Sequence, residues 1–125
     1  MKGLLLLAHG ARDAAWAEPL RDTARQLAAR QPAAQVRLAF LDLQPPSLAE
    51  AGAELAALGC TEVHVLPLFL GGGGHVRQDV PPAVAALRAA HPAVTWRLHP
   101  AAGAAPTLIT ALADWAEAAS QAPAP

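Results

Sequence analysis

The chain has 125 residues, of which 54% are hydrophobic and 15% are charged. This balance is typical of one globular domain and excludes a disordered chain. The formal net charge of −1 gives no electrostatic reason to expect binding to nucleic acid or to an anionic membrane. The single cysteine, Cys60, excludes a disulfide within the chain and a cysteine-rich zinc site. The apolar run Leu4–Ala8 is too short for the core of a signal peptide, and no run approaches bilayer-spanning length, so we expect a cytoplasmic protein.

Strand and helix patterns alternate along the chain. The expected strands are Gly3–Ala8, Gln35–Leu43, Val63–Leu70 and Val94–Leu98, and the expected helices are about Ala15–Arg30, Leu48–Leu58, Val80–Ala90 and Thr107–Ala119. Ser47 and Glu50 have the spacing of a capping box, and Gly59 stands just past the end of the same helix. Pro81 and Pro82 are expected in the first turn of the third helix, where proline is tolerated.

The order βαβαβαβα predicts the fold class α/β. We expect a single three-layer domain over residues 1–120, a four-stranded parallel sheet flanked by helices, with residues 121–125 as a flexible tail. In open sheets of this kind, ligands bind beyond the carboxyl ends of the strands. The residues that directly follow the strands are therefore the first candidates for chemistry.

The stretch Val63–Asp79 combines a buried strand with four consecutive glycines, Gly71–Gly74, and then a histidine, His75. Four glycines in a row carry a large cost in conformational entropy. Such a run is expected where a ligand approaches the backbone closely or where a loop opens and closes. The phosphate-loop pattern fails, because His75 and Val76 stand where lysine and a hydroxyl residue belong. The loop is therefore interpreted as shaped for a large flat or anionic ligand.

Three candidate residues are expected on the same edge of the sheet. His9 follows the first strand, Asp42 lies at the end of the second, and His75 lies in the loop after the third. His99 follows the fourth strand and could join them. The structural interpretation is preferred for His64, which is in mid-strand, and for the helix-terminal histidine at position 91.

Two histidines from different loops favour transient metal binding. Neutral imidazole binds borderline divalent metals, and a two-histidine site leaves most coordination positions open. A free imidazole near neutral pH can also accept a proton. His9 and His75 are therefore interpreted as a pair that could hold a metal ion and pass it on.

Three segments of the chain resemble motifs of one enzyme family. Leu4–Asp13, LLLLAHGARD, resembles the "LLxxHGSR(D)" opening of the short CbiX-type sirohydrochlorin chelatases. Pro67–Pro81, PLFLGGGGHVRQDVP, is similar to their "PxFLxxGxHxxxDIP" element. Phe40–Ser47, FLDLQPPS, resembles the intervening "FLExxEPS" segment. The resemblance covers essentially the whole chain up to the tail.

The resemblance implies a class II tetrapyrrole chelatase, a lyase that inserts a divalent metal into sirohydrochlorin in cobalamin or siroheme biosynthesis. The first choice of metal is cobalt, with iron or nickel as alternatives. The metal ion is a substrate of the reaction, and no tightly bound cofactor is expected. The implied metal ligands are His9 and His75, and His9 is also the implied proton acceptor. The loop of Leu70, Gly71, Gly72, Gly73 and Gly74 is implied to contact the macrocycle. The short form of the family pairs as a homodimer.

The chain departs from the family pattern at its acidic positions. Pro45 replaces the glutamate that precedes Pro-Ser in the family, and the other acidic position is the shorter Asp42. The segment Ala101–Pro106 lacks the "LGxHP" that the family often has. Arg12 and Arg77 stand beside the two histidines and could pair with substrate carboxylates, although both could equally be ordinary surface arginines.

Two other interpretations compete with metal insertion. Histidine phosphatases also place an "LLxRHG" motif after a first strand, but their phosphate-binding arginine is Ala8 here. Alternatively, the chain is a metal-binding or tetrapyrrole-binding module that derives from a chelatase and has lost turnover.

Overall fold

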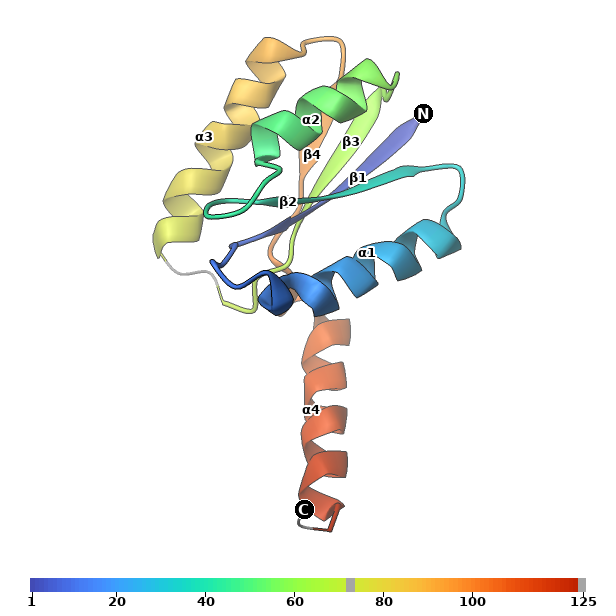
Figure 1. The fold of residues 1–125 in the computed structure, drawn as a ribbon, viewed down its shortest axis with the longest axis vertical. Helices are drawn as coiled ribbons and strands as arrows, with labels where there is room; N and C mark the ends of the chain where they lie inside the picture. The colour runs from blue at the N-terminus through green and yellow to red at the C-terminus, as the bar shows by residue number, and fades with distance from the viewer. Residues whose placement is uncertain (72–73, 124–125) are drawn as a thin grey trace.

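The structure is a computed structural model that describes residues 1–71 and 74–123, with side chains described for residues 1–71 and 78–123. Its strands are β1 (Lys2–Ala8), β2 (Gln35–Phe40), β3 (Glu62–Pro67) and β4 (Thr95–Leu98). Its helices are η1 (Ala14–Ala17), α1 (Glu18–Arg30), α2 (Leu48–Ala57), α3 (Gly74–Ala90), η2 (Ala102–Ala104) and α4 (Pro106–Gln121) (Figure 1).

The four strands form one parallel sheet in the order β2-β1-β3-β4. The predicted α/β fold is thereby confirmed. Because all strands point the same way, the loops that follow them emerge at one edge of the sheet. This carboxyl edge carries the segments after β1, β2, β3 and β4 that were singled out as candidates.

The two faces of the sheet are covered unequally. On one face, α2 and α3 pack over a core of fourteen buried residues that includes Leu5, Val65 and Trp96. On the other face, α1 lies against a smaller cluster, whose buried members among the described residues are Ala8, Ala17 and Phe40. The second face is therefore only partly covered, although four flanking helices were expected.

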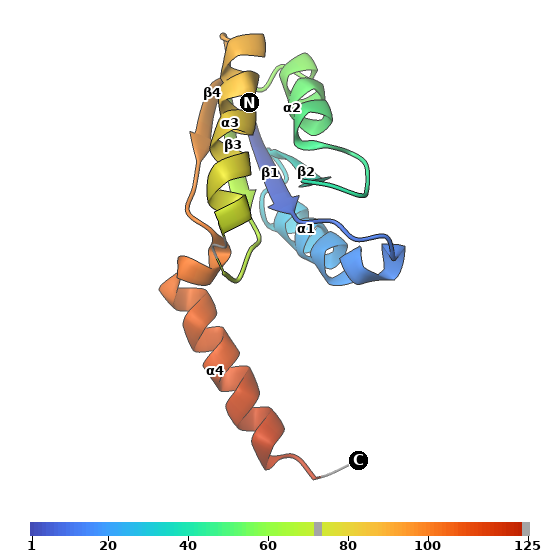
Figure 2. The ribbon, with the colours of Figure 1, turned by 90° about the vertical axis from the view of Figure 1, so that its left-hand side faces the viewer.

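The helix α4 does not cover the sheet. It begins near the carboxyl edge and projects away from the rest of the molecule in both views (Figures 1 and 2). None of its residues, all of which are described, is buried. Within the described part of the chain, no helix combines the length and the apolar character needed to cross a membrane.

The two ends of α2 agree with the local signals in the sequence. The Glu50 N–H donates to Ser47 Oγ at 3.1 Å, and the Ser47 N–H donates back to Glu50 Oε1 at 3.0 Å, so the predicted capping box is confirmed. Gly59 ends the helix with a φ of +96°, a left-handed conformation that glycine adopts without strain.

The expected start of the third helix is wrong. We expected it at Val80, with the two prolines in its first turn, but α3 begins at Gly74 and contains Pro81 and Pro82 in its interior. Burial of Val80, Val84 and Leu87 against the sheet outweighs the missing backbone donors of the prolines. The second and third strands also end early, at Phe40 and Pro67, so the edge loops are longer than expected.

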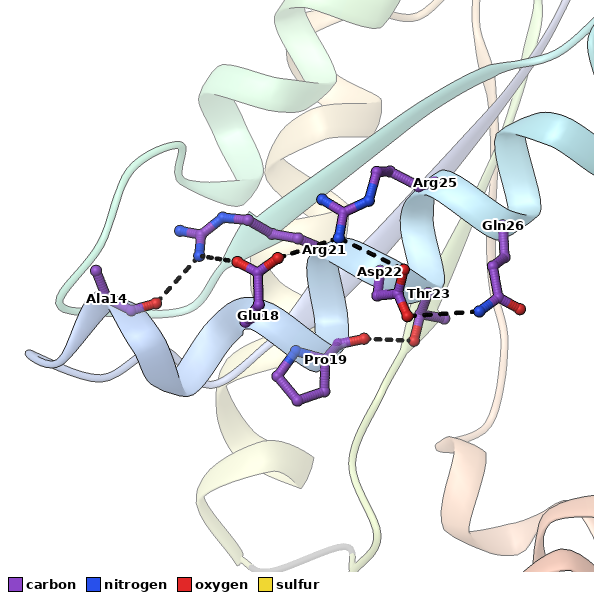
Figure 3. A network of polar contacts seen from close by, with 8 residues as sticks. All are labelled: Ala14, Glu18, Pro19, Arg21, Asp22, Thr23, Arg25 and Gln26. Carbon is purple, nitrogen blue, oxygen red and sulfur yellow. Dashed lines mark hydrogen bonds and ion pairs between the residues drawn. The ribbon is translucent and has the colours of Figure 1, made fainter.

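The outer face of α1 carries a network of exposed polar contacts (Figure 3). Arg25 Nη2 lies 3.0 Å from Glu18 Oε1 and 3.4 Å from Asp22 Oδ1. Arg21 Nη1 donates to the carbonyl oxygen of Ala14 at 3.0 Å, which ties η1 to α1. Exposed pairs of this kind add little stability. They do show that this face of α1 is turned to solvent and that the opposite, apolar face is turned toward the sheet.

Candidate active site at the carboxyl edge of the sheet

His9 is the first residue after β1, and its side chain is exposed at the carboxyl edge. Its imidazole packs against the ring of Phe69, with the ring centroids 4.2 Å apart and an interplanar angle of 41°. Phe69 belongs to the main core and is 1% exposed. A buried aromatic ring thus backs the imidazole, which remains accessible to a ligand.

Gly10 fixes the backbone on which His9 stands. Its φ is +98°, and a Cβ added there would lie 1.8 Å from the carbonyl oxygen of Asp42. The close approach allows the Asp42 N–H to donate to the His9 carbonyl at 3.0 Å, beside a bond of 2.9 Å from the Leu41 N–H to the Ala8 carbonyl. Glycine is required here both by its φ and by the lack of space. The loops after β1 and β2 are thereby joined directly.

Asp42 lies beside His9 at the same edge. Its Oδ1 accepts from the Leu43 N–H at 2.8 Å and so stabilises its own loop, in which Leu43 has a φ of +67°. A second link comes from Gln44, whose Oε1 accepts from the Ala11 N–H at 3.0 Å. One oxygen of the carboxylate is therefore engaged locally. The role of Asp42 in substrate binding stays a prediction.

A cavity of about 330 Å³ opens next to Asp42. It lies between the end of β2, the start of α2 and α3, and its lining includes Asp79 and Ser47 as well as the apolar Phe40 and Ala83. The cavity brings Asp79, from the segment Pro67–Pro81, close to the loop after β2. The three segments that were singled out in the sequence thus converge on one region.

The segment Leu70–Gly71 follows Phe69 and is supported from behind by η2. The Gly103 N–H donates to the Phe69 carbonyl at 2.8 Å, and a Cβ at Gly103 would lie 1.6 Å from the Leu70 carbonyl oxygen. Leu70 is 68% exposed, and Gly71 has open space around its Cβ position. The backbone at this point is firmly held, whereas the Leu70 side chain is available for contact.

Sequence reasoning missed Phe69 and Gly103 as supporting residues. Phe69 was assigned only to the strand, and nothing local indicates that its ring contacts an imidazole sixty positions earlier. Gly103 was noted only as part of a segment that departs from the family pattern. An isolated glycine between alanines is a weak signal for a close backbone approach.

Part of the predicted site cannot be placed. Gly72 and Gly73 lie outside the described residues, and so do the side chains of His75 and Arg77. The backbone of Gly74 and His75 forms the start of α3, so His75 stands on a helix and not in the loop that we expected. Arg12 is exposed in the loop that carries His9.

His99, which could have joined the site, pairs with His64 instead. Its Nε2 lies 2.7 Å from Nδ1 of His64, on the sheet face that α1 partly covers. Nε2 of His64 lies 3.2 Å from Oε2 of Glu62, and the other carboxylate oxygen of Glu62, Oε1, accepts from Arg97 Nε at 2.6 Å. The Arg97 hydrogen bond, followed by that of His64, holds the pKa of Glu62 below its ordinary value.

Among the described side chains, no group of three or more histidine, cysteine or acidic residues is placed to hold a metal ion.

A sequence model of one family, CbiX, matches residues 3–119. The chain belongs to the CbiX family. It is 33% identical in sequence to a cobalamin (vitamin B12) biosynthesis CbiX protein from Marinobacter aquaeolei VT8 of known structure. That similarity covers 97% of this chain and 98% of the other, with a TM-score of 0.84.

Curated relatives of this CbiX chain include sirohydrochlorin cobaltochelatases. The protein of that name from Sulfolobus acidocaldarius is 32% identical over 81 residues, which are 65% of this chain and 64% of the relative. The one from Methanothermobacter thermautotrophicus is 33% identical over 79 residues, 63% of this chain and 54% of the relative. The matches thus span a little over half to about two thirds of those relatives.

A longer chelatase of known structure has a similar fold. The sirohydrochlorin chelatase SirB from Bacillus subtilis subspecies spizizenii, solved in complex with cobalt, has a TM-score of 0.81 and 21% identity. It covers 93% of this chain but only 50% of SirB. At this identity the likeness concerns the fold alone, and a CbiX domain such as this one corresponds in length to half of SirB.

Proposed function

We propose that this CbiX protein is a sirohydrochlorin chelatase that inserts a divalent metal, with Co²⁺ as the first choice, and that it acts as a cytoplasmic homodimer. One observation carries the proposal: the exposed His9 imidazole, backed by the buried Phe69, stands at the carboxyl edge beside Leu70 and Gly71. The names of its CbiX and cobaltochelatase relatives support the same reaction.

Metal insertion exchanges one divalent ion for the two pyrrole N–H protons of the macrocycle. His9 and His75 would hold the incoming ion through neutral imidazole nitrogens and release it to the ring nitrogens. Once freed, His9 would accept one of the two protons, and the other would pass to solvent water. Because the metal is consumed with each turnover, it is a substrate in this scheme.

The surroundings of His9 suit a flat ligand with acidic substituents. Two leucine side chains in the loops at this edge offer apolar contacts: Leu70 is 68% exposed and Leu43 is 55% exposed. Arg12, exposed next to His9, would pair with a carboxylate of the substrate. Asp42, with one oxygen already bonded to Leu43, would act through its remaining oxygen.

The reaction is tested by an anaerobic insertion assay with sirohydrochlorin and each of Co²⁺, Fe²⁺ and Ni²⁺, followed by the change in absorption spectrum. We expect His9→Ala and His75→Ala to abolish insertion. His91→Ala is the matched control, because His91 lies beyond α3 with its ring near Trp96. Wild-type rates in the His9 or His75 variants would contradict the proposal, and binding of sirohydrochlorin without insertion by the wild type would favour a non-catalytic module.

The pH dependence provides a second test. Imidazole binds a metal only when it is neutral, so insertion should fall at acid pH, where the two histidines become protonated. A rate that stays constant down to about pH 5 would rule out neutral histidines as the carriers of the metal.

A further inference from the structure

A chain of polar side chains crosses the partly covered face of the sheet, where β3 and β4 lie side by side. Nδ1 of His64 lies 2.7 Å from Nε2 of His99, and Nε2 of His64 lies 3.2 Å from Oε2 of Glu62. The two imidazole rings are stacked, with their centroids 5.0 Å apart and an interplanar angle of 27°. His64 therefore has a carboxylate at one ring nitrogen and a second imidazole at the other.

The carboxylate determines which nitrogen of His64 carries the proton. An ionised carboxylate only accepts hydrogen bonds, so in neutral His64 the Nε2–H donates to Glu62. Nδ1 then presents a lone pair to His99, whose Nε2–H donates to it. Glu62 is held in turn by Arg97, whose Nε donates to the other carboxylate oxygen at 2.6 Å. The lone pair of His64 is thereby directed at the second imidazole.

This arrangement has the features of a metal-binding histidine pair. A histidine that ligates a metal almost always donates its other ring N–H to a carboxylate, a backbone carbonyl or water, which fixes the tautomer and makes the ligand more basic. Two nitrogens that bind one tetrahedral zinc ion, each at about 2.0–2.1 Å, lie about 3.3 Å apart. The observed separation of His64 Nδ1 and His99 Nε2 is 2.7 Å. The two nitrogens need to separate by only about 0.6 Å to hold such an ion, which small rotations of the rings provide.

A groove beside the two imidazoles has room for an ion and its water ligands. It has a volume of about 240 Å³, and its lining includes Leu4, Leu27 and Leu66 as well as both histidines. A water molecule occupies about 30 Å³ in the liquid. The His64 side chain is 19% exposed, so solvent reaches the ring. An ion at this place would have two protein ligands and would complete its coordination with water.

We propose that His64 and His99 form a binding site for a borderline divalent cation, such as Zn²⁺, Co²⁺ or Ni²⁺, and that Glu62 orients His64 from behind. On binding, the His99 proton moves from Nε2 to Nδ1 through water, so both facing lone pairs bind the ion and no net proton is released. Lys2 also lines the groove, and its charge opposes a bound cation. Coordination by imidazole, and not net charge, therefore selects the ion, which excludes Mg²⁺ and Ca²⁺ because these require oxygen ligands.

The proposed cation site is separate from the site proposed for metal insertion. His64 pairs with Leu4 in the register of the sheet, and His9 stands five residues further along the chain. At the rise of a parallel strand this is a distance of about 16 Å. The His99 N–H already donates to the Val65 carbonyl at 3.0 Å. A bound ion would therefore link the end of β4 to β3 through side chains as well as through the backbone.

The first test is a calorimetric titration with Zn²⁺ of the full chain carrying His9→Ala and His75→Ala. The chain has five histidines, so this parent variant keeps only His64, His91 and His99. We expect one zinc ion per chain, and a loss of at least about tenfold in affinity in His64→Gln or His99→Gln. His91→Gln is the matched control and should bind zinc like the parent. No binding by the parent, or binding that survives both glutamine substitutions, would overturn the site.

The second test identifies the ligating atoms without changing them. In nitrogen NMR spectra of the parent variant, zinc should shift Nδ1 of His64 and Nε2 of His99 most strongly and leave His91 unchanged. Shifts confined to His91, or ligation through Nε2 of His64, would contradict the geometry, and this result does not depend on whether the glutamine variants fold. Glu62→Gln keeps an oxygen that accepts from His64 but removes its charge, and we expect it to weaken zinc binding by about 10–100-fold. Unchanged affinity in Glu62→Gln would refute the orienting role of the carboxylate.

The titration and the insertion assay have independent outcomes. A chain that binds zinc at His64 and His99 but inserts none of the three metals would contradict the proposed function alone. A chain that inserts metal, and whose parent variant binds no zinc, would contradict this cation site alone.

Discussion

The close approach of Gly10 to Asp42 gives a stability prediction with an internal reference. Gly10 and Gly59 have nearly equal φ values, +98° and +96°. An alanine at either position carries the cost of a left-handed L-residue, about 1–2 kcal/mol. Only at Gly10 does the new Cβ meet another atom, the Asp42 carbonyl oxygen at 1.8 Å, whereas Gly59 has nothing within 4 Å.

The clash at Gly10 must be relieved by separating the two loops. The oxygen has to move from 1.8 Å to about 3.0 Å, the shortest distance that real Cβ contacts show. That movement disrupts the bond from the Asp42 N–H to His9 and strains its neighbour from Leu41 to Ala8. Two backbone bonds are together worth about 1–3 kcal/mol. Gly10→Ala should therefore be destabilising by about 2–5 kcal/mol, and Gly59→Ala by about 1–2 kcal/mol.

Equilibrium urea unfolding followed by circular dichroism measures the two values under the same conditions. The metal insertion assay should show a loss for Gly10→Ala alone, because His9 stands on the displaced loop. Equal losses of stability in the two variants would refute the argument, since the contact with Asp42 would then contribute nothing beyond the backbone conformation.

Three further predictions concern the rest of the domain. Ser47→Ala removes the capping box of α2 and should lower the free energy of unfolding by about 1 kcal/mol, measured by urea unfolding. Leu55→Ala, at a fully buried position, should cost about 2–5 kcal/mol, whereas Leu58→Ala, at a position 43% exposed, should cost less than about 0.5 kcal/mol. Since Arg97 lowers the pKa of Glu62, the folded state gains stability above the carboxyl's unfolded pKa of about 4.3 and loses it as the pH falls through the lower folded value. Arg97→Ala should therefore reduce the urea midpoint near about pH 7 more than near about pH 2, and a pH-independent difference would exclude this ion pair as the cause.

Local signals in the sequence predicted most of the fold. The uniform apolar run at the start of the chain predicts a strand that is covered on both faces, and Leu4–Ala8 of β1 are all buried, between β2 and β3. The capping box at Ser47 and the glycine at position 59 predict the ends of α2 to within a residue, because these signals act on backbone groups only a few positions away. The rule that residues following parallel strands lie at one edge of the sheet placed His9 correctly at the carboxyl edge.

The errors arise where contacts that are distant in the sequence decide the outcome. His99 was considered for the site because it follows β4. However, the His99 N–H donates to the Val65 carbonyl at 3.0 Å, so the ladder continues for one more residue. Because side chains alternate between the faces of a sheet, that residue places the His99 ring next to His64. Strand register of this kind depends on the partner strand and is not visible in the sequence of β4 alone.

The position of α4 is the clearest limit of sequence reasoning. The sequence predicts a final helix over Thr107–Ala119, and the structure has α4 there, but the prediction that it flanks the sheet is wrong, since none of its residues is buried. A single residue, Ala105, connects η2 to α4, and the backbone of η2 at Gly103 lies against Leu70. Gly103 thus supports the segment of the predicted macrocycle contact and stands two residues before the connection to α4. Because η2 contacts Leu70 and leads directly into α4, the placement of this helix depends on contacts that are distant in the sequence.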